Sequence, residues 1–266
     1  MDKKKAEKWT GNSDDYQQVF RLGINEYNAS LLDFWRREGL LTPPCRVLDI
    51  GCGVGKYGTW FAELGCDVTL LDISAGMLTH AANNMAPFHG HYSIHCCDFD
   101  ELTGCEKWLS PSFDLSISTM SPAIHDIPTL RKMSEVTDGW CFVTRFRNWA
   151  QPCRDALLEA LGLPVGSNRM GDMQQDCTEL IRMVSALGYT PLVRYTDYNW
   201  ADIRSSREMV EVLCRSCFEQ EPGEEEKQAM AERIRDRMDE NGQIEDAVFT
   251  KVMWLYWNTK ERKTDV

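Results

Sequence analysis

Three glycines at alternate positions, with an acid before and after them, are the residues of this chain best suited to chemistry. The glycines are Gly51, Gly53 and Gly55, and the acids are Asp49 and Asp72. Glycine lets the backbone take a positive φ and approach a ligand closely, because it has no Cβ. An acid at the tip of the next strand can accept hydrogen bonds from the hydroxyls of a ribose. The spacing therefore predicts a site for a ligand that contains a nucleoside.

The elements around these residues have the order of a nucleotide-binding α/β unit. An apolar strand over 46–50 leads into the glycines, an amphipathic helix over 57–64 follows, and a second apolar strand over 67–72 ends at Asp72. Further strands are expected at 92–97, 113–118, 140–144, 192–195 and 247–257. Strands that alternate with helices predict an α/β fold with a doubly wound, mostly parallel sheet. In such sheets ligands bind beyond the carboxyl ends of the strands.

The glycine loop alone fits two kinds of cofactor. Gly53 to Gly58 spells GxGxxG, and Asp72 lies where the dinucleotide fingerprint places its ribose-binding acid. An NAD(P)-dependent oxidoreductase is therefore one alternative. Asp49 counts against it, because a carboxylate at this position would repel a pyrophosphate.

Residues 49–55, Asp-Ile-Gly-Cys-Gly-Val-Gly, resemble motif I of the class I S-adenosylmethionine (SAM)-dependent methyltransferases. Leu71-Asp72-Ile73-Ser74 is similar to the ribose-binding motif of that family. Cys97-Asp98-Phe99 is similar to its adenine-binding motif, and 113–118 to its fourth strand. The four motifs occur in order over about 46–144. The positive sulfonium and ammonium groups of SAM suit a carboxylate at Asp49.

The resemblance implies a seven-stranded sheet, SAM as cofactor, S-adenosyl-L-homocysteine as product and no metal. It implies a cofactor site made of Asp49, Gly51, Cys52, Gly53, Gly55, Asp72, Ile73, Met77, Asp98, Phe99, Met120 and Tyr16. For Met77, a place in the core is an equal alternative. In this family N-terminal helices often cover the cofactor, and two helices are expected over 5–40. Trp9, Tyr16 and Tyr27 are candidates for that cover, since an aromatic face attracts a cation; ordinary packing is the alternative.

The loop over 119–126 is expected to lie between the methyl donor and the acceptor. His125 in this loop is the candidate catalytic residue, because a histidine can take a proton from an attacking hydroxyl, thiol or amine. The alternative is that it serves to cap the next helix. Ser121-Pro122 is similar to part of the Asn-Pro-Pro-aromatic motif of amine methyltransferases, but the other positions differ, so amine chemistry is not implied. Methyl transfer also proceeds mainly by positioning and desolvation.

Beyond the fourth strand the chain offers candidates for contact with the acceptor. Arg145 and Arg147 could meet an anionic substrate, and Trp149 and Trp200 could shape a pocket together with the charged helical stretch over 202–242. We expect a single domain of 266 residues, divided into an N-terminal helical lid (1–42), a Rossmann-like core (43–200), a helical insertion (201–246) and a final strand (247–258).

Composition limits the class of partner. The formal net charge of −12 disfavours nucleic acid, because phosphate binding needs clustered Lys and Arg. No apolar run is long enough to span a bilayer and no secretion signal is visible, so a cytoplasmic location is expected. The 11 cysteines are expected to be reduced, and Cys214-Arg215-Ser216-Cys217 is expected to lie on a helix core face rather than in a metal or redox site.

The sequence therefore predicts methyl transfer from SAM to a small-molecule acceptor. Three alternatives stay open: a methyltransferase that acts on protein or RNA, an NAD(P)-dependent oxidoreductase, and a non-catalytic SAM-binding module.

Overall fold

The structure is a computed structural model that describes residues 2–21, 23–103, 106–109, 112–162, 168–217 and 222–262. The chain forms two compact units. The larger unit consists of Met1–Arg145, Asp176–Tyr195 and Met253–Val266, and the smaller one of Phe146–Gln175 and Thr196–Val252. The smaller unit thus contains the whole of the predicted insertion at 201–246 and, in addition, the segment Phe146–Gln175.

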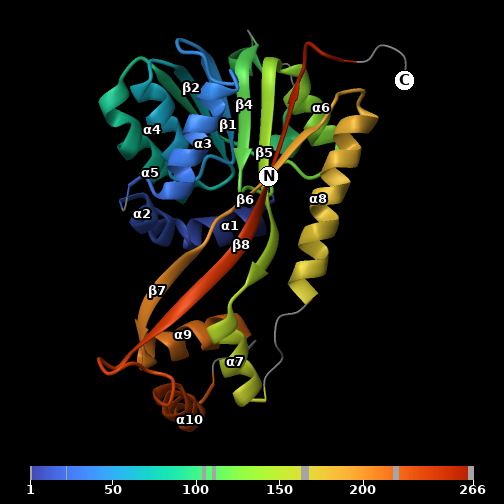
Figure 1. Ribbon diagram of the computed structural model, residues 1–266. Coiled ribbons are helices and arrows are strands. Elements are labelled where there is room, and N and C mark those ends of the chain that lie inside the picture. Colours follow the sequence, from blue (N-terminus) through green and yellow to red (C-terminus); the bar gives the residue numbers. More distant parts are fainter. Residues whose placement is uncertain are drawn as a thin grey trace. The chain divides into compact units, whose positions relative to one another are not determined.

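The sheet is mostly parallel, as the sequence predicts. Its first five strands are β1 (Arg46–Ile50), β2 (Asp67–Asp72), β3 (Tyr92–Cys96), β4 (Phe113–Thr119) and β5 (Thr137–Ala150). The order is β3-β2-β1-β4-β5-β8-β6, and each neighbouring pair from β3 to β5 is parallel (Figure 1). The order reverses between β1 and β4, so the carboxyl ends of these two strands form the topological switch point.

The expected number of seven strands is wrong, because the described residues form a sheet of eight. The last strands are β6 (Leu192–Asp197), β7 (Trp200–Ser205) and β8 (Gln243–Asn258). β7 lies where the sequence predicts helix, and it pairs antiparallel with β8 from Trp200–Val248 to Ser205–Gln243. Its side chains are at most half-buried, so the apolar alternation that identifies a strand is weak there. The antiparallel pairing with β8, and not the local sequence pattern, therefore makes this segment a strand.

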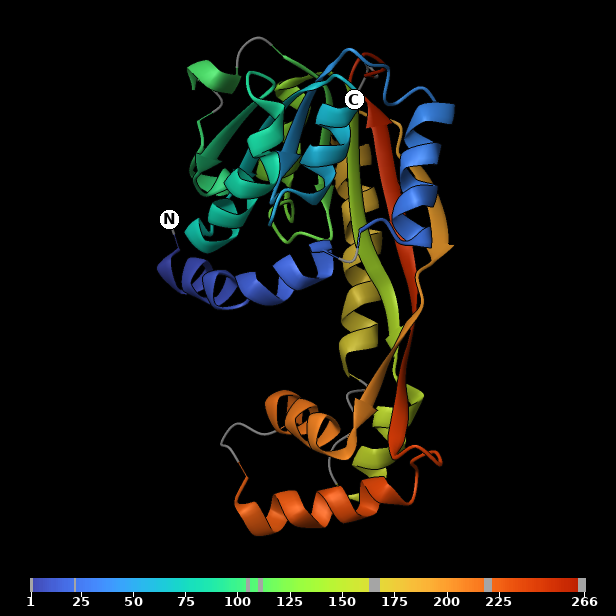
Figure 2. The ribbon, with the colours of Figure 1, turned by 90° about the vertical axis from the view of Figure 1, so that its left-hand side faces the viewer.

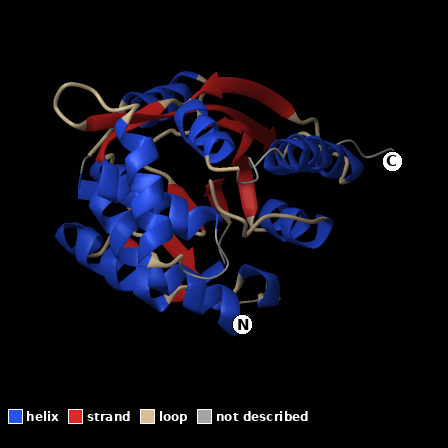
Figure 3. Cartoon of the chain, turned by 90° about the horizontal axis from the view of Figure 1, so that it is seen from below, coloured by secondary structure: helices blue, strands red, loops and turns tan. Residues whose placement is uncertain are grey.

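Helices cover both faces of the larger unit's sheet. α3 (Glu26–Arg37), α4 (Lys56–Glu63) and α5 (Ala75–Met85) lie on one side, and α6 (Ile127–Glu135) and the carboxyl half of α8 (Asn168–Ala186) on the other (Figures 1 and 3). Successive residues of β5 point to opposite faces. The ring of Phe142 packs on Phe34 and Trp35 of α3, while Val143 belongs to the core cluster formed with α6 and α8. This two-sided burial is the doubly wound arrangement that the sequence predicts.

The N-terminal segment has three helices where the sequence predicts two. They are α1 (Lys3–Gly11), α2 (Ser13–Arg21) and α3. α1 ends at Asn12, whose backbone N–H returns to the carbonyl of Trp9. Asparagine and serine compete for backbone hydrogen bonds and favour helix ends, which explains the break. Figure 2 shows α1 and α2 following one another across one end of the larger unit's sheet.

The smaller unit has its own core. It contains α7 (Pro152–Ala160), β7, α9 (Ser206–Cys217), α10 (Glu224–Arg235) and the first part of β8. One hydrophobic cluster of buried residues in it consists of Leu157, Leu158, Met209, Val210, Leu213, Cys214, Met230, Ile234 and Ile244. Cys214 therefore lies on a core face, as expected, while the side chain of Cys217 is outside the described part. Trp149 and Trp200 pack edge to face, with ring centroids 5.1 Å apart.

Within the described ranges, no helix combines the length and the apolar character needed to cross a membrane.

Candidate active site

The glycine loop wraps the tip of β1 through its backbone. Gly51, Gly53 and Gly55 have φ values of 74°, 54° and 79°. The N–H groups of Gly51 and Cys52 both donate to the carbonyl of Leu71, at 2.7 and 3.0 Å. A Cβ at residue 51 would lie 1.9 Å from the Ser121 Oγ, so only glycine fits there. The loop is thus held against the ends of two neighbouring strands, and it leads directly into α4.

Asp49 is a buried carboxyl without a partner. Its side chain is fully enclosed, and neither carboxyl oxygen has a hydrogen bond within the described part of the chain. Burial, with a further contribution from the nearby Asp72 carboxylate, raises the pKa of Asp49 to about 8. A buried polar group without a partner is costly. A cation placed beside Asp49 would supply the missing interaction. The buried carboxyl therefore suits a positively charged ligand.

Asp72 is positioned by backbone donors. Its Oδ2 accepts from the N–H of Gly53 at 2.9 Å, and its Oδ1 accepts from the N–H of Ser74 at 2.8 Å. Burial raises the pKa of Asp72, and these hydrogen bonds act in the opposite direction. A carboxylate oxygen has two lone pairs, so each oxygen still has capacity for a ligand hydroxyl. The geometry suits the predicted contact with a ribose diol.

Three other residues of the predicted cofactor site lie around the loop. Cys52 is buried, and burial together with Asp49 and Asp72 raises the pKa of its thiol well above the usual value, so it is not a nucleophile. Met77 is buried with its Sδ 3.9 Å from the position of a Cβ on Gly53. Ile73 is half-buried. Met77 therefore packs in the core beneath the loop, and its contact with a cofactor stays a prediction.

Asp98 and Phe99 follow β3. The Asp98 Oδ1 accepts from the N–H of Asp100 at 3.2 Å and caps a 3-10 turn, η2 (Phe99–Glu101). Phe99 is buried in the core cluster between the sheet and α6. Its carbonyl accepts from the Lys132 Nζ at 2.6 Å. Asp98 thus lies just after the end of β3, where its contact with a ligand stays a prediction, and the ring of Phe99 packs in the core.

The N-terminal helices contact the strand ends through polar groups. The Thr10 Oγ1 lies 3.0 Å from the Ser74 Oγ, next to Asp72. Tyr16 is 47% exposed and packs edge to face on Trp9, with centroids 6.1 Å apart. Burial raises the pKa of the Tyr16 phenol, and the Asp72 carboxylate raises it further. α1 and α2 therefore bring two aromatic rings to the edge of the site.

Tyr27 does not belong to that group. It is buried, and its hydroxyl accepts a hydrogen bond from the Trp254 Nε1 at 3.2 Å. Tyr27 therefore packs in the core, which is the alternative that the sequence left open.

The loop after β4 begins with an unusual backbone. Met120 has a φ of 50°, a region that residues other than glycine seldom adopt. Its N–H donates to the Thr144 Oγ1 on β5 at 2.9 Å, which fixes the turn. Strained backbone of this kind clusters at functional sites. The turn directs the chain back under Gly51, where Ser121 is buried.

His125 bonds to the start of the helix that follows it, while its catalytic role stays a prediction. Its backbone N–H donates to the Thr129 Oγ1 at the start of α6, at 3.2 Å. Its ring Nδ1 lies 3.2 Å from the Pro122 carbonyl, and because a carbonyl only accepts, Nδ1 carries the proton. In the neutral ring Nε2 is then the atom with the free lone pair. Nε2 points toward the carboxylates of Asp100 and Asp126, 3.8 and 4.0 Å away.

The two arginines proposed for an anionic substrate fall in different units. The Arg145 guanidinium donates to the carbonyls of Thr144 and Ile124, and burial lowers its pKa to about 10. It therefore holds the loop after β4 in place. Arg147 belongs to the smaller unit.

The comparisons with known proteins agree with this geometry. Residues 47–138 match a family described as a methyltransferase domain. A malonyl-[acyl-carrier protein] O-methyltransferase from Enterobacter lignolyticus (strain SCF1) is 27% identical over 172 residues, which cover 55% of this chain and 66% of the relative. A second protein of that name, from Buchnera aphidicola subsp. Baizongia pistaciae (strain Bp), is 29% identical over 150 residues, or 54% of this chain and 52% of the relative. The chain thus spans between about half and two thirds of the length of these relatives.

Among solved structures, magnesium protoporphyrin IX methyltransferase from Synechocystis PCC 6803 with bound S-adenosylhomocysteine aligns with a TM-score of 0.47 at 18% identity. The alignment covers 68% of this chain and 76% of the other. The matched segment 47–138 contains β1, the glycine loop, Asp72, Asp98 and the loop after β4. Through this segment the chain is similar to a methyltransferase domain.

Proposed function

We propose that the chain transfers a methyl group from SAM to a small-molecule acceptor. The observation that carries the proposal is Asp49, a fully buried carboxyl at the end of β1 that has no hydrogen-bond partner among the described residues. Such a group destabilises the fold unless a ligand complements it. A cationic ligand would suit this carboxyl, because burial and a neighbouring carboxylate raise the pKa of Asp49 to about 8 and a positive charge would counter both effects.

The cofactor would be held by groups that already lie at the strand ends. Asp72 would accept hydrogen bonds from the ribose hydroxyls, and the glycine loop would let the ligand approach the backbone of residues 51–55. Asp98, at the end of β3, would meet the adenine amino group. Tyr16 and Trp9 would cover the ligand from α1 and α2. The bound cofactor supplies an activated methyl group, and these residues bind it and orient it.

Proton removal from the acceptor is assigned to His125. The Pro122 carbonyl fixes the proton on Nδ1, which leaves Nε2 to accept a proton from the acceptor. Asp100 and Asp126 are near enough to Nε2 to stabilise the charged ring once the proton has arrived. Positioning and exclusion of water supply the larger part of the rate, so loss of His125 is expected to reduce turnover without abolishing it.

The names of the curated relatives provide a second candidate acceptor. They describe transfer to malonyl-[acyl-carrier protein], and the sequence similarity favours testing a carboxylate of that kind. The net charge of −12 favours a small molecule over a nucleic acid. Methyl transfer to protein, and a non-catalytic SAM-binding role, are the remaining outcomes of the test.

The test is methyl transfer from SAM that carries a labelled methyl group. The purified chain is incubated with panels of small hydroxy, thiol, amine and carboxylic acids, and separately with malonyl-[acyl-carrier protein]. Label in a small molecule supports the proposal, and its loss in Asp49→Asn ties the activity to this site. Label only in the carrier protein would replace the acceptor, and SAM binding without any label would indicate the non-catalytic module.

A further inference from the structure

A pair of side-chain amides connects the N-terminal helix α2 to the glycine loop. The Gln17 Nε2 donates to the Asn84 Oδ1 at 3.0 Å, and the Asn84 Nδ2 donates to the Gln17 Oε1 at 2.9 Å. The same Asn84 Nδ2 donates to the carbonyl of Val54 at 2.8 Å. One carboxamide, at the end of α5, therefore bonds both a helix that covers the site and the loop between Gly53 and Gly55.

We infer that Asn84 and Gln17 are positioning residues, which make the shape of the glycine loop depend on the docking of α2. The inference rests on the proposed function, because the loop is taken to bind SAM. Gln17 is only 9% exposed, so its amide is largely removed from bulk water, and Asn84 provides its two side-chain hydrogen bonds. When α2 leaves, Asn84 loses two of its three bonds and its remaining bond to Val54 is no longer oriented by the pair.

The link has a direct consequence for the predicted cover. α2 carries Tyr16 next to the Asp72 carboxylate, one residue before Gln17. The residue that fastens the helix and the residue that meets the ligand are therefore on the same turn. A ligand that binds the loop favours the docked helix, and by linkage the docked helix favours the ligand.

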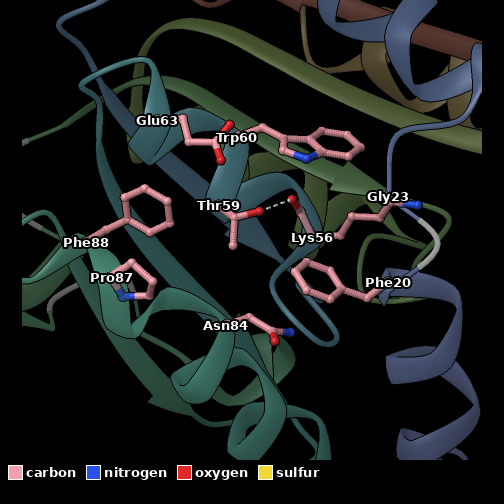
Figure 4. Close-up of a pocket in the computed structure, with 9 residues that line it drawn as sticks. All are labelled: Phe20, Gly23, Lys56, Thr59, Trp60, Glu63, Asn84, Pro87 and Phe88. Atoms are coloured by element: carbon pink, nitrogen blue, oxygen red, sulfur yellow. Dashed lines mark hydrogen bonds between the residues drawn. The ribbon is translucent and has the colours of Figure 1, made fainter.

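The chain contains a matched control for this link. Asp14 of α2 and His80 of α5 join the same two helices, with 3.0 Å between Oδ1 and Nε2, and within the described part of the chain neither side chain has a hydrogen bond or ion pair to the loop. Asn84 also lines a surface pocket of about 250 Å³ together with Phe20 of α2 and Lys56 of α4 (Figure 4). Since water in this pocket reaches residue 84, a substitution there leaves no sealed cavity, and the variant is expected to fold.

Two substitutions cut the link on either side of Asn84. Asn84→Asp keeps the acceptor for Gln17 but replaces the donor to Val54 with a carboxylate. Gln17→Leu removes the α2 side and leaves the Asn84–Val54 bond possible. Each is expected to weaken SAM binding about tenfold, the effect of one to two hydrogen bonds, while Asp14→Asn stays within about twofold. The double variant should lose no more than the larger single loss, because the residues act as one unit.

The experiment has a readout that does not need SAM. Hydrogen exchange of the backbone amides of residues 53–55 is measured in the ligand-free chain. Exchange is expected to accelerate in Asn84→Asp and in Gln17→Leu, although Gln17 does not touch the loop, and to remain unchanged in Asp14→Asn. If Gln17→Leu matches Asp14→Asn in both exchange and SAM affinity, the inference is wrong. If the unmodified chain binds no SAM, the proposed function fails, and the exchange data still decide the link.

Discussion

Replacement of Asp49 by asparagine should stabilise the ligand-free chain and weaken its binding of SAM. In the folded chain the pKa of Asp49 is about 8, and in the unfolded chain it returns to about 3.8. The folded state therefore binds the proton more tightly, so this residue favours folding most at low pH, and its contribution declines as the pH rises from about 4 toward 8. Asparagine has the same shape and no proton to gain.

The size of the effect follows from that difference in pKa. Each factor of ten in proton affinity corresponds to about 1.4 kcal/mol. Relative to the unmodified chain, Asp49→Asn should raise the free energy of unfolding by about 2 kcal/mol at pH 5 and about 4 kcal/mol at pH 7. Urea unfolding at the two pH values measures both numbers. Asp67→Asn, an exposed carboxylate at the opposite end of β2, is the control and should change stability by no more than about 0.5 kcal/mol.

The same substitution that raises the stability of the chain should lower its affinity for SAM. A cationic ligand favours the ionised carboxyl, so SAM affinity of the unmodified chain should rise with pH up to about 8 and then level off. Asp49→Asn should bind SAM at least about tenfold more weakly, with no such rise. Calorimetric titration at pH 6, 7 and 8.5 gives both results. Equal stability and equal SAM affinity in the two proteins would refute the assignment of Asp49 as the cation-binding group.

Three further substitutions test other parts of the site. Asp72→Ala should weaken SAM binding by about 1.5–3 kcal/mol, because charge-assisted hydrogen bonds to the ribose are lost; unchanged affinity in a folded variant, measured by calorimetry, would show that the tip of β2 does not meet the ligand. His125→Gln should lower kcat about 10²-fold at neutral pH with little change in SAM affinity, and a kcat equal to that of the unmodified chain would assign the residue to helix capping alone. Gly51→Ala should destabilise the chain by more than about 2 kcal/mol in urea unfolding, since its Cβ would overlap the Ser121 Oγ; a stable variant that binds SAM normally would contradict the close approach of this loop.

The sequence predicted the central part of the fold because its signals there are local. The apolar strand at 46–50, the three glycines and Asp72 fix one strand–loop–helix–strand unit, and the structure has β1, α4 and β2 at nearly the expected bounds. Burial of Asp49 also follows from the predicted fold, since a strand covered on both faces has no exposed side.

The features that the sequence did not predict depend on distant partners. β7 is a strand because β8 pairs with it, and its own pattern is not apolar enough to show this. Asn84 gave no signal, because its partners Gln17 and Val54 lie 67 and 30 positions away along the chain. The positive φ of Met120 has no compositional signature, since the residue type is unfavourable for it.

Calorimetric titration of the unmodified chain with SAM and S-adenosylhomocysteine, with NAD(H) and NADP(H) in parallel, tests the central claim most directly. Binding of SAM and its product in the micromolar range, with no heat from the nicotinamide cofactors, is the predicted result. Binding of a nicotinamide cofactor with none of SAM would contradict the proposed function and leave the α/β fold unchanged.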